Sequence, residues 1–153
     1  MTEHLLSTLG LALRAGAVAV GEEPVGAAAR AKKARVIFTA RDAAASSVRR
    51  AYSSGRAGSC LCLPFPADKE TFGRALGRTS VAMCAVTDIG FAQSLVKKLA
   101  AAEPEIYGAA AEALDLKAKR ARERKEEQLQ HEKNLRQGRH RVHGGKPPEP
   151  PHA

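Results

Sequence analysis

The sequence predicts an α/β domain, in which helices cover both faces of a central sheet, followed by a charged tail. The alternation of two kinds of segment indicates this fold class. Short runs of apolar and β-branched residues alternate with segments whose apolar residues recur at helical spacing. Strands separated by helices in this way form a sheet with a helical layer on each face. The alternation stops near residue 102, where the chain becomes strongly polar.

Each expected element has its own local signal. Helices are expected over 5–15, 22–33, 43–54, 69–77 and 91–101, some from apolar residues at helical spacing and others from residues that open or cap a helix. The strands, marked by compact apolar runs, are expected over 17–20, 36–39, 60–63 and 81–86. Asp42 and Asp68 precede helices that they can cap, while Gly16 and Gly77 follow helices that they can end.

The C-terminal third has a different composition. We expect a domain over residues 1–102 and a tail over 103–153 that is first helical and then disordered near Pro147–Pro151. An apolar patch at Ile106, Tyr107 and Leu114 opens the tail. From Lys117 onward, eleven Lys and Arg face five Glu, and the few apolar residues cannot offset the entropy of ordering.

Charge points to a polyanionic partner. The chain of 153 residues has a formal net charge of +9 and an isoelectric point of about 9.9. Such an excess raises the local concentration of the protein near nucleic acids. The longest apolar run, residues 9–20, is interrupted by Arg14 and is shorter than a membrane span, which needs roughly 20 residues. The N-terminus lacks the pattern of a secretory signal, so we expect a cytoplasmic protein.

The residue inventory argues against an enzyme. His4 is the one histidine of the expected domain, so a hydrolytic triad would have no base there. No glycine-rich phosphate loop occurs. Cys60, Cys62 and Cys84 lack further ligands at zinc spacing and are interpreted as core thiols. We therefore expect no metal, no cofactor and no small-molecule substrate.

Basic residues gather at turns between the expected elements. They are Arg30, Lys32, Lys33 and Arg35 around one loop, Arg41 after the next strand, and Arg74 and Arg78 on either side of Gly77. If the sheet brings these turns to one side, they can contact phosphates and position an RNA. Aromatic residues make up 4% of the chain, which favours recognition of RNA shape over base stacking on a sheet.

Five motifs occur in a fixed order. They are LGLALRAG (9–16), GEE (21–23), ARVIFTARDA (34–43), FGRALG (72–77) and AVTD (85–88). In this order and spacing the chain resembles the kink-turn-binding ribosomal-protein family, whose members include archaeal and eukaryotic large-subunit proteins. The small bacterial YlxQ-type proteins are the most similar. The resemblance covers about residues 4–100 and leaves the tail outside.

The resemblance implies a three-layer α/β/α sandwich with a four-stranded mixed sheet that binds structured RNA without a cofactor. In the family, the start of the second helix enters the widened groove of a kinked RNA, and the loop before the last strand packs on an extruded base. By position, the helix side corresponds to Gly21, Glu22, Glu23, Pro24 and Ala27, with Asp42 beside it and Arg30 and Arg41 adding charge. The loop side corresponds to Arg78, Thr79 and Ser80.

Three positions differ from the family pattern for RNA reading. Where that pattern has Asn, Glu and, one turn later, Lys, this chain has Glu23, Pro24 and Ala27. Each lost contact is worth on the order of 1–3 kcal/mol, so weaker and more salt-sensitive binding is expected. The expected function is non-catalytic binding of ribosomal or kink-turn-like RNA by a monomeric accessory protein of the ribosome or of translation. The alternatives are a protein-interaction module and a substrate-binding domain like those of RNA 2′-O-methyltransferases.

Overall fold

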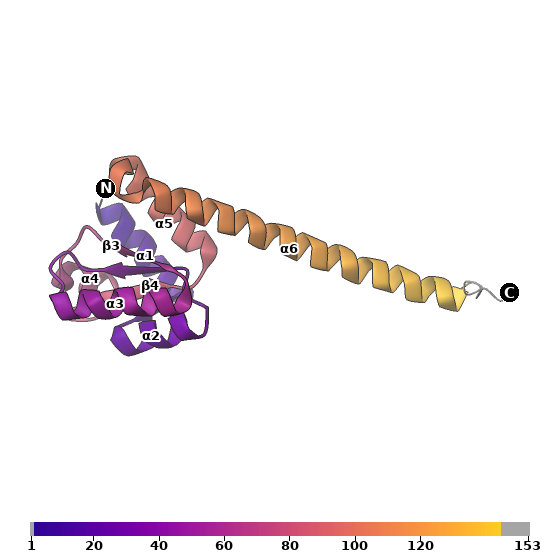
Figure 1. Cartoon of the computed structure of the whole chain (residues 1–153), viewed down its shortest axis with the longest axis horizontal. Coiled ribbons are helices and arrows are strands. Elements are labelled where there is room, and N and C mark those ends of the chain that lie inside the picture. Colours follow the sequence, from indigo (N-terminus) through magenta and orange to yellow (C-terminus); the bar gives the residue numbers. More distant parts are fainter. Residues whose placement is uncertain (1, 145–153) are drawn as a thin grey trace. The chain divides into compact units, whose positions relative to one another are not determined.

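The structure, a computed structural model, describes residues 2–144, and within them it contains six helices and four strands (Figure 1). The helices are α1 (Thr2–Arg14), α2 (Glu22–Arg30), α3 (Ala45–Gly58), α4 (Lys69–Ala75), α5 (Ile89–Ala102) and α6 (Pro104–Gly144). The strands are β1 (Val18–Val20), β2 (Val36–Thr39), β3 (Leu61–Pro64) and β4 (Met83–Val86). The predicted α/β fold class and its alternation of helices and strands are confirmed.

The four strands form one mixed sheet in the order β1-β4-β2-β3. β1 and β2 both run antiparallel to β4, and β3 runs parallel to β2. As a result, β1, β2 and β3 all end at the same end of the sheet, where β4 begins. This end is called the α2 end here, because α2 starts directly after β1. Four chain connections that are distant in sequence therefore meet there.

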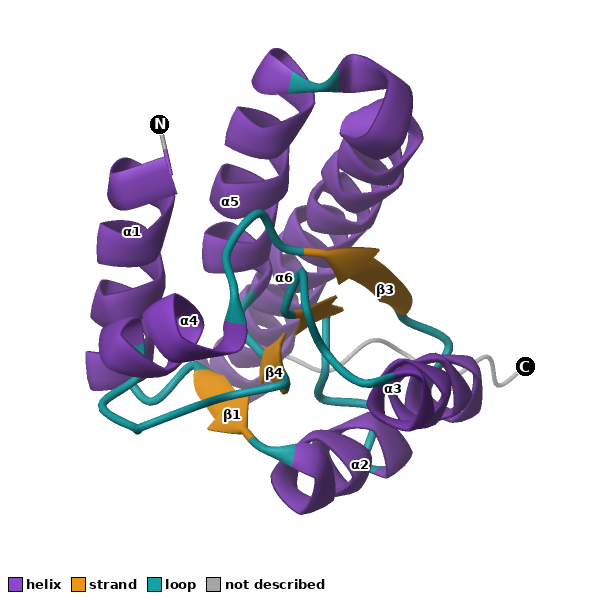
Figure 2. Cartoon of the chain, turned by 90° about the vertical axis from the view of Figure 1, so that its left-hand side faces the viewer, coloured by secondary structure: helices purple, strands orange, loops and turns teal. Residues whose placement is uncertain are grey.

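Helices cover both faces of this sheet, which makes the predicted sandwich of three layers (Figure 2). On one face, α2 and α3 pack over Ile37 and Ala85 through Val25 and Ala51. The other face carries a larger core that α1, α4, α5 and the beginning of α6 share. Its centre contains three phenylalanine rings. The ring centroid of Phe65 lies 5.3 Å from that of Phe38 and 5.0 Å from that of Phe72. Adjacent residues of β2 face opposite layers, so the whole strand is buried.

Some local expectations were wrong. α2 ends at Arg30, and Lys32 lies beyond it with a φ of 61°, so the cations of the following turn do not extend the helix. Asp42 does not cap α3, whose N-cap is Ala44 and has no side-chain hydrogen bond. By contrast, Asp68 caps α4 as expected, because its carboxylate accepts a hydrogen bond of 2.8 Å from the backbone N–H of Thr71.

The first compact unit extends to Leu116, beyond the boundary expected at residue 102. The first turns of α6 belong to it, because Tyr107 and Leu114 are buried in the larger core. The hydroxyl of Tyr107 donates a hydrogen bond of 2.6 Å to the carbonyl oxygen of Pro64. Tyr107 and Leu114 are about two helical turns apart and so lie on the same face of α6. This spacing indicated a core contact, although the surrounding sequence is polar.

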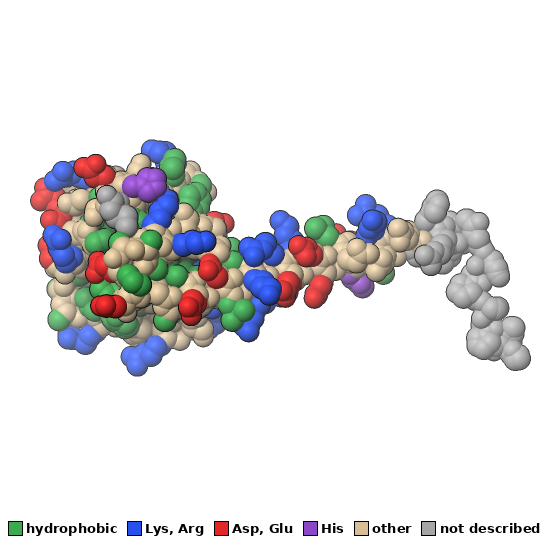
Figure 3. Space-filling model, turned by 90° about the horizontal axis from the view of Figure 1, so that it is seen from above, with side chains coloured by type: hydrophobic (Ala, Val, Ile, Leu, Met, Phe, Trp, Pro, Cys, Tyr) green, Lys and Arg blue, Asp and Glu red, His purple; other side chains and the backbone are tan. Residues whose placement is uncertain are grey.

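The second unit begins at Lys117, and α6 continues in it as far as Gly144. Lys, Arg and Glu side chains are interspersed there along the helix, and four Lys and Arg precede the first glutamate, Glu123 (Figure 3). The disorder expected near Pro147–Pro151 falls outside the described residues. Among the helices that are described, none combines the length and apolar character needed to span a membrane.

Candidate nucleic-acid interface

Gly21 joins β1 to α2 at the α2 end of the sheet. Its φ of 97° lies in the region that favours glycine, and this conformation turns the chain from the strand into the helix. Its N–H donates a hydrogen bond of 3.1 Å to the carbonyl oxygen of Met83, the first residue of β4. No side chain caps the first turn of α2. The start of α2 is thus fixed directly beside the segment that leads into β4.

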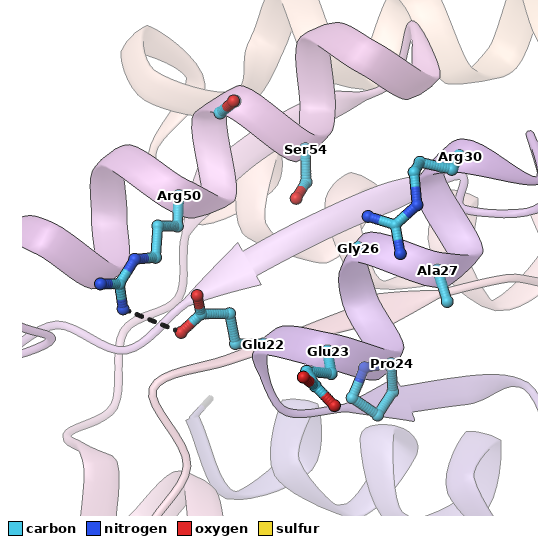
Figure 4. Close-up of a pocket in the computed structure, with 9 residues that line it drawn as sticks. Glu22, Glu23, Pro24, Gly26, Ala27, Arg30, Arg50 and Ser54 are labelled. Atoms are coloured by element: carbon cyan, nitrogen blue, oxygen red, sulfur yellow. Dashed lines mark hydrogen bonds and ion pairs between the residues drawn. The ribbon is translucent and has the colours of Figure 1, made fainter.

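The first turn of α2 carries both expected glutamates. The carboxylate of Glu22 forms an ion pair of 3.1 Å with the guanidinium of Arg50 on α3, and both side chains are about half exposed (Figure 4). Glu23 and Pro24 are exposed beside it. The pair connects α2 with α3 and neutralises one of the two negative charges at this end of the helix.

A hollow of about 710 Å³ lies between α2 and α3. Its lining includes five of the expected RNA-binding residues, namely Glu22, Glu23, Pro24, Ala27 and Arg30. Arg30 is at the far end of α2, but its side chain returns along the helix. One of its guanidinium nitrogens lies 3.1 Å from the point where a Cβ on Gly26 would be. The hydroxyl of Ser54, on α3, is 3.7 Å from the same point, so glycine leaves space between two hydrogen-bonding groups.

The second expected group lies on the loop of residues 77–82, which connects α4 to β4. The N–H of Arg78 donates a hydrogen bond of 2.7 Å to the carbonyl oxygen of Gly73, and the N–H of Val81 donates one of 3.0 Å to that of Lys69. A Cβ on Gly73 would lie only 2.8 Å from the backbone nitrogen of Ser80. The loop therefore rests on α4 at backbone contact distance, while its side chains at 78–80 are exposed.

This loop borders a second hollow of about 510 Å³. Its lining brings together the expected residues Asp42, Arg78, Thr79 and Ser80 with three residues of α4, which are Lys69, Glu70 and Arg74. Asp42 has a structural role here, because its carboxylate accepts a hydrogen bond of 2.8 Å from the backbone N–H of Lys69. It ties the end of β2 to the start of α4.

Arg41 belongs to the same surroundings. Its backbone N–H donates to the carbonyl oxygen of Ala67 at 2.8 Å, and its side chain is exposed. The pKa of Asp68 is lowered, chiefly by the hydrogen bond from the Thr71 N–H and further by the nearby charges of Arg41 and Arg74. Arg41 thus places positive charge near the start of α4, whereas Arg74 forms an ion pair of 2.9 Å with Glu70 on the same helix.

The sheet does not bring all the basic turns together. Arg41 and Arg78 lie at the α2 end, where β2 ends and β4 begins. Lys32, Lys33 and Arg35 precede β2 and lie at the opposite end. Lys32 is held there, because its ammonium donates a hydrogen bond of 2.8 Å to the carbonyl oxygen of Ala57. The basic turns predicted to lie together therefore form two groups that α2 and α3 connect.

Sequence reasoning missed the contribution of α3. Arg50, Ser53 and Ser54 form one wall of the α2–α3 hollow, and their spacing of three and four residues places them on one helix face. A signal was present in the sequence, because the segment 45–58 contains three arginines and no acidic residue. That charge could not be assigned to the interface without knowing that α3 lies beside α2.

The thiols lie away from both hollows. Burial raises the pKa of Cys62 to about 12, with a smaller contribution from Cys60, and burial also raises the pKa of Cys84. Both groups therefore stay protonated at neutral pH. Within residues 2–144, no three His, Cys, Asp or Glu side chains gather as metal ligands would.

The chain matches no protein-family model and no curated protein. Solved structures do share its fold. A protein of unknown function from Bacillus halodurans is similar with a TM-score of 0.56 and 26% sequence identity, over 61% of this chain and 93% of that one. The Giardia lamblia 15.5kD RNA binding protein is similar with a TM-score of 0.50 and 16% identity, over 72% of this chain and 86% of that one.

Proposed function

We propose that this chain binds structured RNA, without catalysis, through the start of α2 and the 77–82 loop. The observation that carries the proposal is the meeting of these two segments at the α2 end of the sheet, where the Gly21 N–H bonds to Met83. The proposal is supported by the fold shared with the Giardia RNA-binding protein and by a motif order that resembles that of the kink-turn-binding ribosomal proteins. We place the chain in this family, as a cytoplasmic accessory protein of the ribosome or of translation.

The charge of this surface suits an RNA backbone. The residues that line the two hollows include five Lys and Arg against four Asp and Glu, and the exposed Arg41 beside them brings the net charge to +2. The two glutamates of α2 would repel phosphates, but Arg50 pairs with one of them. The positive field attracts RNA from a distance and its contacts release counterions, which makes the binding sensitive to salt.

The geometry favours recognition of shape. The exposed first turn of α2 can enter a groove that a kink has widened, while Arg78, Thr79 and Ser80 on the rigid 77–82 loop meet the nucleotides at the kink. Backbone and hydroxyl contacts of this kind position an RNA without reading its sequence. Because Pro24 and Ala27 provide no amide or ammonium, base-specific contacts contribute little to the affinity.

Three further observations support a binding role over a catalytic one. The thiols of Cys62 and Cys84 stay protonated, so neither is an activated nucleophile. His4, the one histidine before position 131, is exposed in the first turn of α1. The two hollows offer arginines, serines and glutamates but no nucleophile paired with a base.

A protein-interaction module is the second candidate function. Pro24 and Ala27 are exposed, uncharged and adjacent to the hollow, and this favours a contact with a protein over a contact with a phosphate. Crosslinking in cells separates the two candidates. Recovery of RNA attached to the chain supports the proposal, whereas recovery of proteins alone favours the interaction module.

Binding titrations test the site itself. The full chain should prefer a bulged, kinked duplex RNA over an unstructured RNA of equal length. Arg78→Glu should reduce the affinity for the kinked duplex by about tenfold, as expected for the loss of one charged hydrogen bond. Lys97→Glu is the matched control, because it makes the same charge change at an exposed side chain of α5. If both variants bind the kinked duplex equally well, the proposed site is wrong.

A further inference from the structure

The outer face of α3 has a composition unlike the rest of the surface. Tyr52 is 49% exposed, whereas the other five aromatic side chains of the chain are buried or partly buried. Arg49 and Arg56 lie three residues before it and four after it, so all three share one stripe of the helix. Both arginines are exposed, and neither makes a side-chain hydrogen bond or ion pair with another described residue.

From this arrangement we infer that the outer face of α3 binds single-stranded RNA, with an unpaired base stacked on Tyr52 and phosphates held by Arg49 and Arg56. The inference rests on the proposed function, because it extends the RNA-binding surface beyond the start of α2. The two arginines are about 10 Å apart along the helix axis, so they contact the backbone on either side of the stacked base. Aromatic stacking with flanking cations is the usual basis of single-strand binding.

The position of α3 connects this face to the proposed site. α3 begins after β2, at the α2 end of the sheet, and runs back toward the opposite end, where Lys32 bonds to Ala57. Arg50, Ser53 and Ser54 line the hollow that α3 shares with α2 (Figure 4). A strand that leaves the kink can cross this hollow, follow Tyr52 and Arg56, and reach the second group of basic residues.

The composition of the face favours RNA over a protein partner. Tyr and Arg are both common at protein–protein interfaces, but the core of such an interface is a patch of several large apolar side chains. Among the described residues of α3, Tyr52 is the one large apolar side chain that is exposed, and it stands between arginines. No acidic residue of α3 opposes a phosphate. A single aromatic ring within an excess of positive charge fits a base and its backbone.

The test uses the full chain and three probes: a kinked duplex, the same duplex with a single-stranded oligouridine extension, and oligouridine alone. The extension should increase the affinity of the parent protein. Tyr52→Ala should lower the affinity for the extended duplex by about fivefold or more, in line with the cost of losing one stacked base. Tyr52→Phe should keep the affinity of the parent protein. The double variant Arg49→Gln/Arg56→Gln should flatten the salt dependence, and Arg14→Gln/Lys97→Gln, which removes two exposed charges from α1 and α5, is the charge-matched control.

Photocrosslinking locates the contact directly. With 5-iodouridine in the extension, the crosslink should map to the tryptic peptide 51–56, which contains Tyr52 as its aromatic residue. The inference is overturned if the extension adds no affinity, if Tyr52→Ala binds like the parent, or if the crosslink lies elsewhere. It is also overturned if Tyr52→Ala loses a captured protein but no RNA binding.

The same experiment separates this inference from the proposed function. A crosslink of oligouridine to peptide 51–56, without binding of the kinked duplex, would support the α3 face and refute the proposed site. Binding of the kinked duplex that depends on Arg78, without any gain from the extension, would support the proposed site and refute the α3 face.

Discussion

Single residues determine how the 77–82 loop is held. Gly73 is the clearest case, because the loop passes over it at a distance that leaves no space for a side chain. The backbone of Ser80 and the carbonyl oxygen of Arg78 occupy the volume that a Cβ would need, at 2.8 and 2.9 Å. Backbone cannot move aside as a flexible side chain does, so this glycine fixes the distance between α4 and the loop.

Gly73→Ala should therefore move the loop and destabilise the fold. Overpacking at such a contact costs about 1–3 kcal/mol in the free energy of unfolding. The variant should also lose preference for the kinked duplex, because Arg78 shifts. Gly108→Ala on α6 is the control, since no atom beyond its chain neighbours and its own helix backbone lies within 4 Å of its Cβ position. Denaturant unfolding of both variants checks this, and a Gly73→Ala protein as stable as the control would contradict the close contact.

Tyr107 is a second residue whose role is testable. Tyr107→Phe keeps the ring in the core but removes the hydrogen bond to Pro64, which should cost about 1 kcal/mol. Burial, and then Glu103, raise the pKa of Tyr107. A raised pKa means that its contribution to stability is complete below about pH 10 and is lost as the pH rises further.

The stability difference between the parent and Tyr107→Phe should thus shrink above about pH 10. Urea unfolding of the two proteins at several alkaline pH values measures this difference. The thiols of Cys62 and Cys84 also lose their contribution at alkaline pH, but they do so equally in both proteins. A difference that is constant with pH would show that the Tyr107 hydroxyl is not buried against Pro64.

Among the elements, the beginning of α6 differs most from its prediction, because it was assigned to the tail but contributes to the core of the domain. Removing everything after residue 104 deletes Tyr107 and Leu114 from the core, at about 1.5–3 kcal/mol each. That loss is a large fraction of the free energy of unfolding of a typical domain, which is roughly 5–15 kcal/mol. We expect residues 1–116 to unfold cooperatively and residues 1–104 to be marginal. A sharp unfolding transition for 1–104 would contradict this.

The elements themselves were largely predictable. Apolar runs and helical spacing, together with residues that open or cap helices, indicated the helices and strands of the domain, since a sandwich of this kind needs each element to bury one face or both. The ends were less predictable. Asp42 looked like a helix cap, but its carboxylate bonds to the Lys69 N–H, which is distant in sequence. Tertiary hydrogen bonds of this kind leave no periodic signal.

The candidate site was predictable in part. The resemblance to a family indicated the start of α2 and the 77–82 loop, but which residues share a hollow depends on the strand order β1-β4-β2-β3. That order places Arg78 beside Asp42 and leaves Lys32 at the other end. Arg50 was missed for the same reason, because its pairing with Glu22 requires α3 to lie against α2.

At the scale of the whole molecule, charge is divided unevenly along the chain. Residues 1–116 carry fourteen Lys and Arg against eleven Asp and Glu, a net +3, whereas residues 117–153 carry a net +6. The tail therefore contributes more to general attraction, and the folded unit contributes the shaped surface. Removing the tail should weaken binding to all RNAs alike and reduce the steepness of the salt dependence by at most about 5 in the log–log slope.

The most direct test of the central claim is the ratio of affinities for kinked and unstructured RNA, measured for the full chain and for residues 1–116 at several salt concentrations. If the folded unit recognises RNA shape, the ratio stays the same after the tail is removed, while both affinities fall. If residues 1–116 bind no RNA at low salt, or bind both RNAs equally, the tail is the RNA-binding element and the site at the α2 end of the sheet is refuted.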